Sequence, residues 1–250
     1  MKKTITKNLI LIGGGRWAKI YLEELLKKKI FIYLLTSNNN LKKFFIKHNF
    51  HNYKFIKKLN EVNIDNKYYL ILINKTEKRL KFIKKIINLK NQILIEKPLT
   101  NNPNDYFKYK LNKKNTYLSL QFYFAIYFAS IKKEIKNEKI EYLKVDWFDN
   151  KNEKKNFNKK INFIEDSFYH FFSIVRIFIK STRLINDNSI IKKTQIKSNF
   201  KNIQIILNSS KNSYNKKRIL FIKTNKNEYT INFKNLNAIY IKKNKNKKIK

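Results

Sequence analysis

The chain has 250 residues, which is enough for one large domain or two small ones. Its 57 Lys and Arg residues against 17 Asp and Glu residues give a net charge of +40, but the lysines are spread along the whole chain beside abundant Asn, Ile, Phe and Tyr. This is the residue set of A+T-rich codons, so the charge does not indicate a nucleic-acid or membrane partner, as a stripe or tail of charge would.

Cysteine and long apolar segments are both missing from the sequence. The absence of cysteine excludes disulfides, thiolate nucleophiles and Cys-based metal sites. The apolar patch at 9–12 is too short for a signal peptide. The longest nearly apolar stretch, at 122–131, is well below the roughly 18 residues that span a bilayer. The sequence therefore predicts a cytoplasmic protein without a transmembrane segment.

The first half of the chain has the pattern of βαβ units, because short apolar runs alternate with amphipathic, Lys-rich segments. Strands are predicted at 9–12, 30–35, 53–56, 69–73 and 92–95. Helices are predicted between them at 17–28, 41–48 and 77–89, and a helix at 104–111 and a strand at 116–121 complete the domain. The expected fold is α/β, a doubly wound parallel sheet of the Rossmann type over 1–122.

The second half, 123–250, has a different texture. A helix is predicted at 123–136, a strand at 140–148, a polar loop at 149–160, and a helix at 163–179 that is apolar around most of its circumference and therefore buried. Strand-like runs follow at 195–198, 203–207, 219–223, 229–233 and 239–242, with a hairpin connection at 224–228. Strands in series with short turns predict an α+β domain with a mainly antiparallel sheet.

All three glycines of the chain are consecutive and follow the first predicted strand. They form a G-x-G-x-x-A pattern with Gly13, Gly15 and Ala18. In a dinucleotide-binding turn the first glycine permits the tight turn, the second lets the backbone approach a pyrophosphate, and the small third residue lets helix and strand pack closely. The alternative is a plain strand-to-helix turn. The strand before the turn, the helix after it and the series of five βα-type units favour dinucleotide binding.

The end of the second strand bears on the choice between NAD and NADP. NAD enzymes usually carry an acid there for the ribose 2′-hydroxyl, whereas this chain has Thr36, Ser37 and Asn38, with Lys42 and Lys43 following. Neutral hydroxyls and nearby cations favour NADP over NAD. The expected cofactor-binding residues are Gly13, Gly14, Gly15, Arg16, Trp17, Ala18, Thr36, Ser37, Asn74, Glu96 and Lys97.

The fifth strand ends in Glu96, Lys97 and Pro98, and a D-x-x-x-H pair, Asp166 and His170, follows in the second half. With the glycine turn, these motifs resemble those of the Gfo/Idh/MocA oxidoreductase family over residues 8–180. The resemblance implies hydride transfer between NAD(P) and a small alcohol, carbonyl or imine, sugar-like or polyol-like. The chain departs from the family at Phe168, where a small residue is usual, and is shorter than most members, which implies shortened loops or a trimmed sheet.

Hydride chemistry at a carbonyl needs a proton carrier and a group that stabilises a negatively charged oxygen. His170 suits the first role, because imidazole titrates near neutrality, and Lys97 suits the second. By the resemblance, Asp166 binds substrate or orients the imidazole. Independently, Asp166, His170 and Ser173 form a polar stripe on an otherwise apolar helix. The alternative is an acid at a helix N-terminus and a histidine satisfied within the core.

Other functions remain open at this point. The remaining histidines, His48 and His51, lie in a polar segment and are expected on the surface. No metal-ligand cluster and no G-x-S-x-G elbow are present. A non-catalytic dinucleotide- or sugar-binding member of the family is the main alternative, and a charge-driven nucleic-acid-binding module is another. The expected partners are a small-molecule substrate, no specific nucleic acid, no membrane, and a second copy through the C-terminal sheet.

Overall fold

The computed structural model describes residues 8–28, 30–48, 50–64, 68–99, 114–150, 163–179, 190–191, 194–235 and 239–245. The chain divides into two compact units, Met1–Ser119 and Leu120–Lys250. The division follows Ser119, whereas the sequence places it near Phe122. No helix in the described part of the chain combines the length and the apolar character that crossing a bilayer requires.

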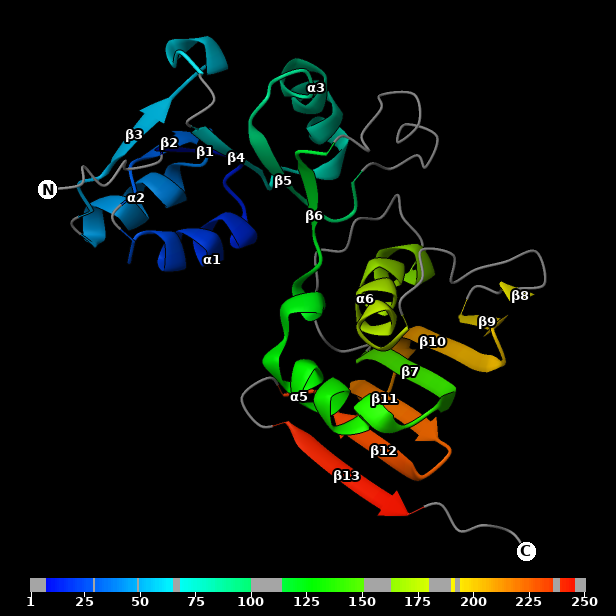
Figure 1. Ribbon diagram of the computed structural model, residues 1–250. Helices are drawn as coiled ribbons and strands as arrows, with labels where there is room; N and C mark the ends of the chain where they lie inside the picture. The colour runs from blue at the N-terminus through cyan, green and yellow to red at the C-terminus, as the bar shows by residue number, and fades with distance from the viewer. Residues whose placement is uncertain are drawn as a thin grey trace, which may run out of the picture. The chain divides into compact units, whose positions relative to one another are not determined.

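The first unit is built on a parallel sheet of six strands in the order β3-β2-β1-β4-β5-β6 (Figure 1). The strands are β1 (Asn8–Ile12), β2 (Ile32–Leu35), β3 (Tyr53–Ile56), β4 (Tyr68–Leu72), β5 (Gln92–Glu96) and β6 (Thr116–Ser119). The order reverses between β1 and β4, which makes the carboxyl ends of these two strands a topological switch point where ligands bind in such sheets. The predicted doubly wound parallel sheet is confirmed.

Helices cover both faces of this sheet, because β1 is apolar on both sides. Leu9 and Leu11 pack toward α1 (Arg16–Leu25) and α2 (Asn39–Lys47), whereas Ile10 and Ile12 pack toward α3 (Thr76–Ile86). All four side chains are buried. Such continuous apolar runs are typical of parallel strands buried on both faces. This packing fixes where the turn after β1 emerges.

The second unit contains a seven-stranded sheet in the order β13-β12-β11-β7-β10-β9-β8. Its strands are β7 (Ile140–Asn150), β8 (Ile190–Ile191), β9 (Gln195–Phe200), β10 (Ile203–Ser213), β11 (Lys217–Thr224), β12 (Asn227–Asn232) and β13 (Tyr240–Lys245). Neighbouring strands pair antiparallel except β7 with β10. The predicted α+β domain with a mainly antiparallel sheet is confirmed, as is the hairpin between β11 and β12.

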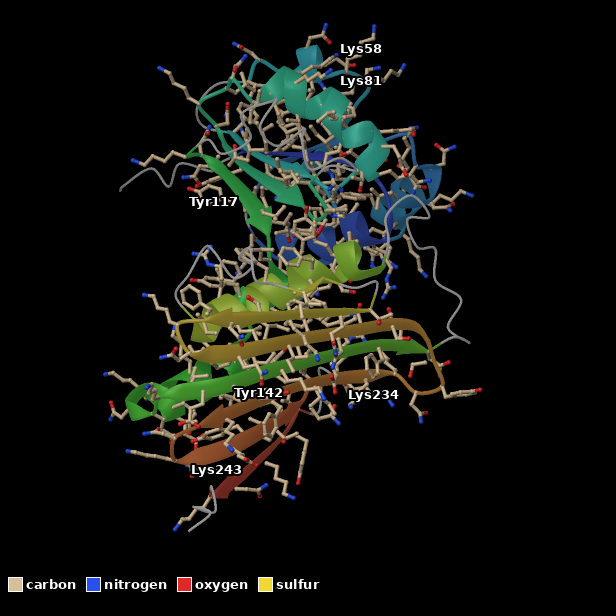
Figure 2. The ribbon with its side chains drawn as sticks, turned by 90° about the vertical axis from the view of Figure 1, so that its right-hand side faces the viewer. Lys58, Lys81, Tyr117, Tyr142, Lys234 and Lys243 are labelled. Atoms are coloured by element: carbon tan, nitrogen blue, oxygen red, sulfur yellow. The ribbon has the colours of Figure 1, made fainter. Side chains whose placement is uncertain are left out.

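The two faces of this sheet differ. Leu143, Val145 and Trp147 of β7 point into a core formed with α5 (Ile126–Glu134) and α6 (Phe163–Phe178). Tyr142, in the middle of the sheet in Figure 2, lines a hollow of about 320 Å³ on the face that does not join this core, together with Lys144, Asp146, Ile219, Phe221 and Thr230. Pairing of two copies through this sheet stays a prediction.

Several predicted boundaries in the second unit were wrong. The helix expected at 123–136 is divided into the short 3₁₀ turn η2 (Gln121–Phe124), α5, and η3 (Ile135–Asn137). The polar loop expected at 149–160 was wrong at its start, because Asp149 and Asn150 still belong to β7 and Asp149 pairs with Arg218, and residues 151–160 lie outside the described residues. The two-residue strand β8 was missed. The helix predicted at 104–111 lies outside the described residues.

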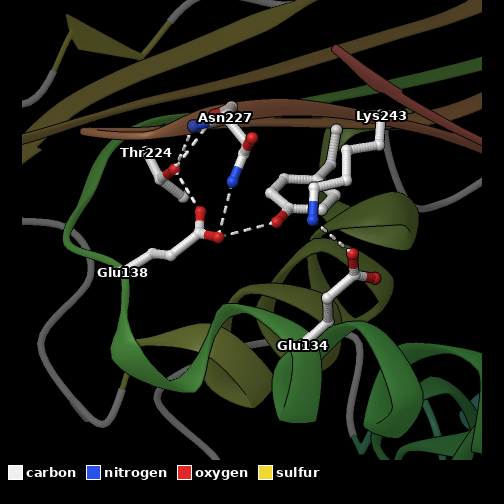
Figure 3. Close-up of polar contacts among 6 residues, drawn as sticks. Glu134, Glu138, Thr224, Asn227 and Lys243 are labelled. Carbon is white, nitrogen blue, oxygen red and sulfur yellow. Dashed lines mark hydrogen bonds and ion pairs between the residues drawn. The ribbon is translucent and has the colours of Figure 1, made fainter. Parts of the chain in front are cut away.

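Glu138, just after η3, ties this turn to the β11–β12 hairpin (Figure 3). Its carboxylate accepts hydrogen bonds from Asn227 Nδ2 at 2.7 Å, from the Tyr229 hydroxyl at 2.9 Å and from the Thr224 hydroxyl. Burial raises the pKa of Glu138, but these hydrogen bonds outweigh it and hold the pKa below its ordinary value. The ionised carboxylate therefore stabilises this end of the sheet.

Candidate functional site

The turn after β1 approaches the end of β4 so closely that only glycine fits at its first position. Gly13 has φ +136°, and a Cβ atom there would lie 2.7 Å from the backbone nitrogen of Asn74 and 2.8 Å from the carbonyl carbon of Ile73. Both the positive φ and the close contact exclude other residues. Gly13 thus has the turn-forming role that the sequence predicted for it, at the switch point of the sheet.

The second glycine is held by the end of β2. A Cβ atom on Gly14 would lie 2.0 Å from the Thr36 hydroxyl oxygen, and the Asn38 side-chain amide donates to the Gly14 carbonyl. The Thr36 hydroxyl in turn accepts from the Asn38 main-chain nitrogen at 3.1 Å. Thr36 and Asn38 therefore support the shape of the glycine turn, and Ser37 between them is exposed.

The third glycine faces open space. No atom of the described residues lies within 4 Å of a Cβ built on Gly15, which is the N-cap of α1. Arg16 and Trp17 are exposed, whereas Ala18 is fully buried. The free backbone N–H groups and the positive dipole end of α1 therefore border a space that protein atoms leave open, and such a helix start binds phosphate groups.

Asn74, two residues beyond β4, carries a buried and unpaired side-chain amide. Its side-chain Nδ2 and Oδ1 atoms are both buried, and neither has a hydrogen-bond partner among the described residues. Leaving a buried amide unpaired costs about 1–3 kcal/mol for each unsatisfied group. A polar ligand that donates to Oδ1 and accepts from Nδ2 would remove this cost. The predicted cofactor residues of the first unit thus gather at one edge of the sheet.

Arg79, a residue of α3, binds the backbone at this edge of the sheet, and it was not among the residues predicted from the sequence. It is 3% exposed, and its guanidinium donates to the main-chain carbonyls of Asn74, at 2.7 Å, and of Glu96 and Pro98. A planar guanidinium with several fixed donors can hold carbonyls from separate segments together. One signal could have found it, because Arg79 is one of five arginines in a chain whose cations are otherwise lysines.

Lys97 lies between two of the carbonyls that Arg79 binds. It follows β5, is half-buried, and forms a cis peptide bond with Pro98. Its main-chain nitrogen donates to the Glu96 carboxylate at 3.1 Å. The buried Arg79 side chain therefore holds the backbone on both sides of Lys97. Lys97 lies at the carboxyl edge of the sheet, where the sequence predicted a site.

The Glu96 carboxyl is itself buried, at 5% exposure. Burial raises its pKa above the ordinary value, although a hydrogen bond with Ser119 and the charges of Lys97 and Arg79 oppose the rise. Ser119, at the end of β6, also shares a 2.8 Å hydrogen bond with the Tyr21 hydroxyl of α1. A polar chain thus links α1, β6 and β5 behind Lys97.

In the second unit, His170 lies on α6 and is half-buried. Its ring stacks on Trp147 with centroids 4.4 Å apart and planes 8° apart, and it meets the edge of Phe122 at 5.3 Å. The Asp166 backbone belongs to the same helix one turn earlier, and its side chain lies outside the described residues. Lys97 and His170 belong to different units, so their action on one substrate stays a prediction.

Two further predictions concern Ser173 on α6 and the histidines His48 and His51. Ser173 is not part of an open polar stripe, because its buried hydroxyl donates to the His170 main-chain carbonyl at 2.8 Å, as serines inside helices commonly do. His48 and His51 are exposed, as expected. Within the described ranges no three His, Asp or Glu side chains gather closely enough to hold a metal ion.

Comparison with known proteins relates this fold to solved oxidoreductases. No protein-family model matches the sequence, and no curated protein matches it significantly. A Gfo/Idh/MocA family oxidoreductase from Vibrio cholerae matches with TM-score 0.71 and 12% identity, over 97% of this chain and 83% of that one. The UDP-N-acetylglucosamine 3-dehydrogenase GnnA from Acidithiobacillus ferrooxidans matches with TM-score 0.73 and 11% identity, over 97% and 83% of the two chains.

A third structure, the dehydrogenase MviM from Clostridium difficile, matches with TM-score 0.69 and 16% identity, over 97% of this chain and 84% of that one. All three similarities extend over both units of the chain. At these identities they show a common fold. The resemblance to the Gfo/Idh/MocA family is therefore confirmed at the level of the fold.

Proposed function

We propose that this chain, which has the fold of the Gfo/Idh/MocA oxidoreductases, is an NAD(P)-dependent oxidoreductase of that family. One observation carries the proposal: an open helix start at Gly15 and the unpaired buried amide of Asn74 follow the two strands that flank the switch point. A plain strand-to-helix turn leaves the Asn74 amide unexplained. A dinucleotide with a pyrophosphate and several polar groups explains both.

The first unit supplies the residues that hold the dinucleotide. The backbone of the glycine turn and the start of α1 bind its pyrophosphate, with Arg16 and Trp17 at the rim. The end of β2, with Thr36 and Ser37, receives the adenosine ribose, and the absence of an acid there favours NADP. Asn74 pairs with a polar group of the cofactor. When bound, the nicotinamide accepts or donates the hydride.

The protein's own catalytic task is then to move one proton and to stabilise charge on oxygen. In the oxidative direction His170 accepts the hydroxyl proton of the substrate through a ring nitrogen, and in the reductive direction it returns that proton. The Lys97 ammonium donates a hydrogen bond to the same substrate oxygen and stabilises its developing negative charge. Asp166 binds substrate or orients His170. The substrate class is a small alcohol, carbonyl or imine of sugar or polyol type.

A turnover assay tests this function. NADPH and NADH oxidation are followed with a panel of keto sugars, sugar nucleotides and cyclic imines, first for the wild type and then for His170→Gln and Lys97→Met. We expect each variant to lower kcat by about 10²-fold or more, and His170→Gln to leave the dissociation constant of the cofactor nearly unchanged. His48→Gln, at an exposed histidine, is the matched control.

Unchanged turnover in both variants would contradict the assigned roles. Tight NADPH binding without turnover of any panel member would favour a non-catalytic dinucleotide-binding protein. Failure to bind either nicotinamide cofactor would overturn the proposed function as a whole.

A further inference from the structure

Trp147 of β7 is covered on both faces of its indole ring. His170 stacks parallel to it with centroids 4.4 Å apart, and the guanidinium carbon of Arg218 lies 3.9 Å from the same ring centroid. If both groups lay on the same face of the indole, their short distances from its centroid would leave them too little room side by side, and their atoms would overlap. His170 and Arg218 therefore lie on opposite faces of Trp147.

This arrangement excludes a common function of exposed tryptophans. A sugar substrate stacks on a free aromatic face, whereas both faces of Trp147 are occupied and the residue is 8% exposed. Its indole ring instead packs between two planar groups, the imidazole of His170 and the guanidinium of Arg218. Trp147 therefore serves as a packing surface for the imidazole of His170.

Arg218 is fixed to the sheet independently of Trp147. It is 7% exposed, pairs with the buried Asp149 carboxylate, and donates to the main-chain carbonyls of Phe148 at 2.5 Å and Lys217 at 2.8 Å. Arg218 and Trp147 are also direct cross-strand partners on β11 and β7. Because these contacts come from the backbone and from a buried carboxylate of the sheet, the guanidinium plane has a defined orientation, and Trp147 is held against it.

We propose that Trp147 and Arg218 are positioning residues for His170. The parallel stack blocks rotation of the imidazole about its Cβ–Cγ bond, and the edge of Phe122 limits its tilt. The two ring nitrogens are then held in a plane parallel to the indole and are presented only at the ring edge. The catalytic consequence rests on the proposed function, in which a nitrogen of His170 carries the proton, whereas the stack itself can be tested without any substrate.

The test uses Trp147 as its own reporter. The chain has two tryptophans, so Trp17→Phe leaves Trp147 as the single tryptophan, which is excited apart from the 15 tyrosines at the long-wavelength edge of its absorption. A protonated imidazole in contact with an indole quenches its fluorescence more than a neutral one does. We therefore expect a step in Trp147 emission when the pH is lowered far enough to protonate His170. His170→Gln in the same background should abolish the step, and His48→Gln should leave it unchanged.

Arg218→Lys tests the far side of the stack, since it keeps a cation for Asp149 but removes the planar group. We expect the fluorescence step to lose at least half its amplitude, and kcat to fall about tenfold with little change in KM. Trp147→Phe keeps an aromatic face for His170 and should retain more activity than Trp147→Leu at matched folded fraction. That rescue distinguishes positioning from a purely structural role.

The outcomes separate the two proposals. A step in the Trp17→Phe protein that persists in His170→Gln, or an amplitude unaffected by Arg218→Lys, would overturn the positioning role. If the pH-dependent step in Trp147 emission is found as expected but His170→Gln turns over substrate at the wild-type rate, Trp147 and Arg218 do position His170. The proton-carrying role of His170 in the proposed function would then be wrong.

Discussion

The Arg79 guanidinium donates to the main-chain carbonyl of Asn74 at 2.7 Å, so the residue with the unpaired buried amide is held by the same side chain that holds the backbone around Lys97. One buried arginine thus connects the end of β4 with the end of β5. The two ends belong to neighbouring strands of the sheet. This connection makes the geometry of the candidate site depend on a residue that does not itself face it.

Replacing Arg79 tests this dependence. Arg79→Lys keeps the charge, but the single ammonium nitrogen cannot take the places of the two guanidinium nitrogens that reach Asn74 on one side and Glu96 and Pro98 on the other. We expect the free energy of unfolding to fall by about 1.5–3 kcal/mol, as for other hydrogen bonds to charged groups. Urea unfolding followed by circular dichroism measures the change. Lys78→Gln, on an exposed position of the same helix, is the control and should change stability by less than about 0.5 kcal/mol. Equal stability of Arg79→Lys and wild type would show that the hydrogen bonds of Arg79 to the three carbonyls do not stabilise the fold.

The glycines differ in what they contribute to stability. Gly13→Ala places a Cβ against the backbone of Ile73 and Asn74 at a positive φ, so we expect a loss of about 2 kcal/mol or more. Gly15→Ala meets no described atom and should cost less than about 0.5 kcal/mol. Thermal unfolding of the two variants in the absence of cofactor checks the difference. Equal melting temperatures would show that the turn is not built as described.

We expect cofactor choice to depend on the cations that follow β2. Lys42 and Lys43 are both exposed, and the Lys42 ammonium lies over the Phe55 ring at 5.6 Å. We therefore expect a lower dissociation constant for NADPH than for NADH, and a selective weakening of NADPH binding in Lys43→Gln that exceeds the effect of Lys42→Gln. Titrations must share one salt concentration, because the charge of the chain attracts any anion. A clear preference for NADH would refute the NADP assignment.

The Glu138 cluster predicts a pH dependence of stability. Because hydrogen bonds hold the folded-state pKa below the ordinary value of about 4.3, the ionised carboxylate stabilises the fold above that pH, and this contribution is lost as the pH falls through the folded-state pKa. Glu138→Gln should therefore be less stable than wild type at neutral pH, and the difference should narrow in acid. Urea unfolding at several pH values measures it.

A matched control for this effect lies next to the cluster. Glu134 forms an exposed 2.8 Å ion pair with Lys243, and Glu134→Gln should change stability by less than about 1 kcal/mol. If Glu138→Gln and Glu134→Gln were equally stable at every pH, the hydrogen bonds to Glu138 would contribute nothing beyond an ordinary surface pair.

The fold and the glycine turn could be predicted because their signals are local. An apolar strand, three adjacent glycines and a following helix determine the turn within a few residues, and the run ending in Glu96 and Lys97 marks a strand end. Arg79 and Arg218 could not be predicted in the same way. Their partners are main-chain carbonyls and rings brought close by strand pairing, and no sequence spacing encodes such contacts.

The boundary errors have a similar physical origin. The segment predicted as one helix at 123–136 is interrupted at Ala125, whose extended backbone places Phe122 and Phe128 together in the core. The strand β7 continues to Asn150 because Asp149 has a buried partner on β11. In both places tertiary contacts decide the local conformation against the sequence propensity.

The central claim is that the open start of α1 at Gly15 binds a nicotinamide dinucleotide, and an equilibrium titration tests it most directly. The fluorescence of NADPH is followed as wild-type protein and Gly15→Val are added, after both proteins are shown to unfold at the same urea concentration. A valine side chain would occupy the space that described atoms leave open at Gly15 and would keep the pyrophosphate off the backbone. We predict a dissociation constant at least about tenfold higher for Gly15→Val, a difference of about 1.4 kcal/mol. Equal affinities of the two proteins for NADPH would contradict the claim.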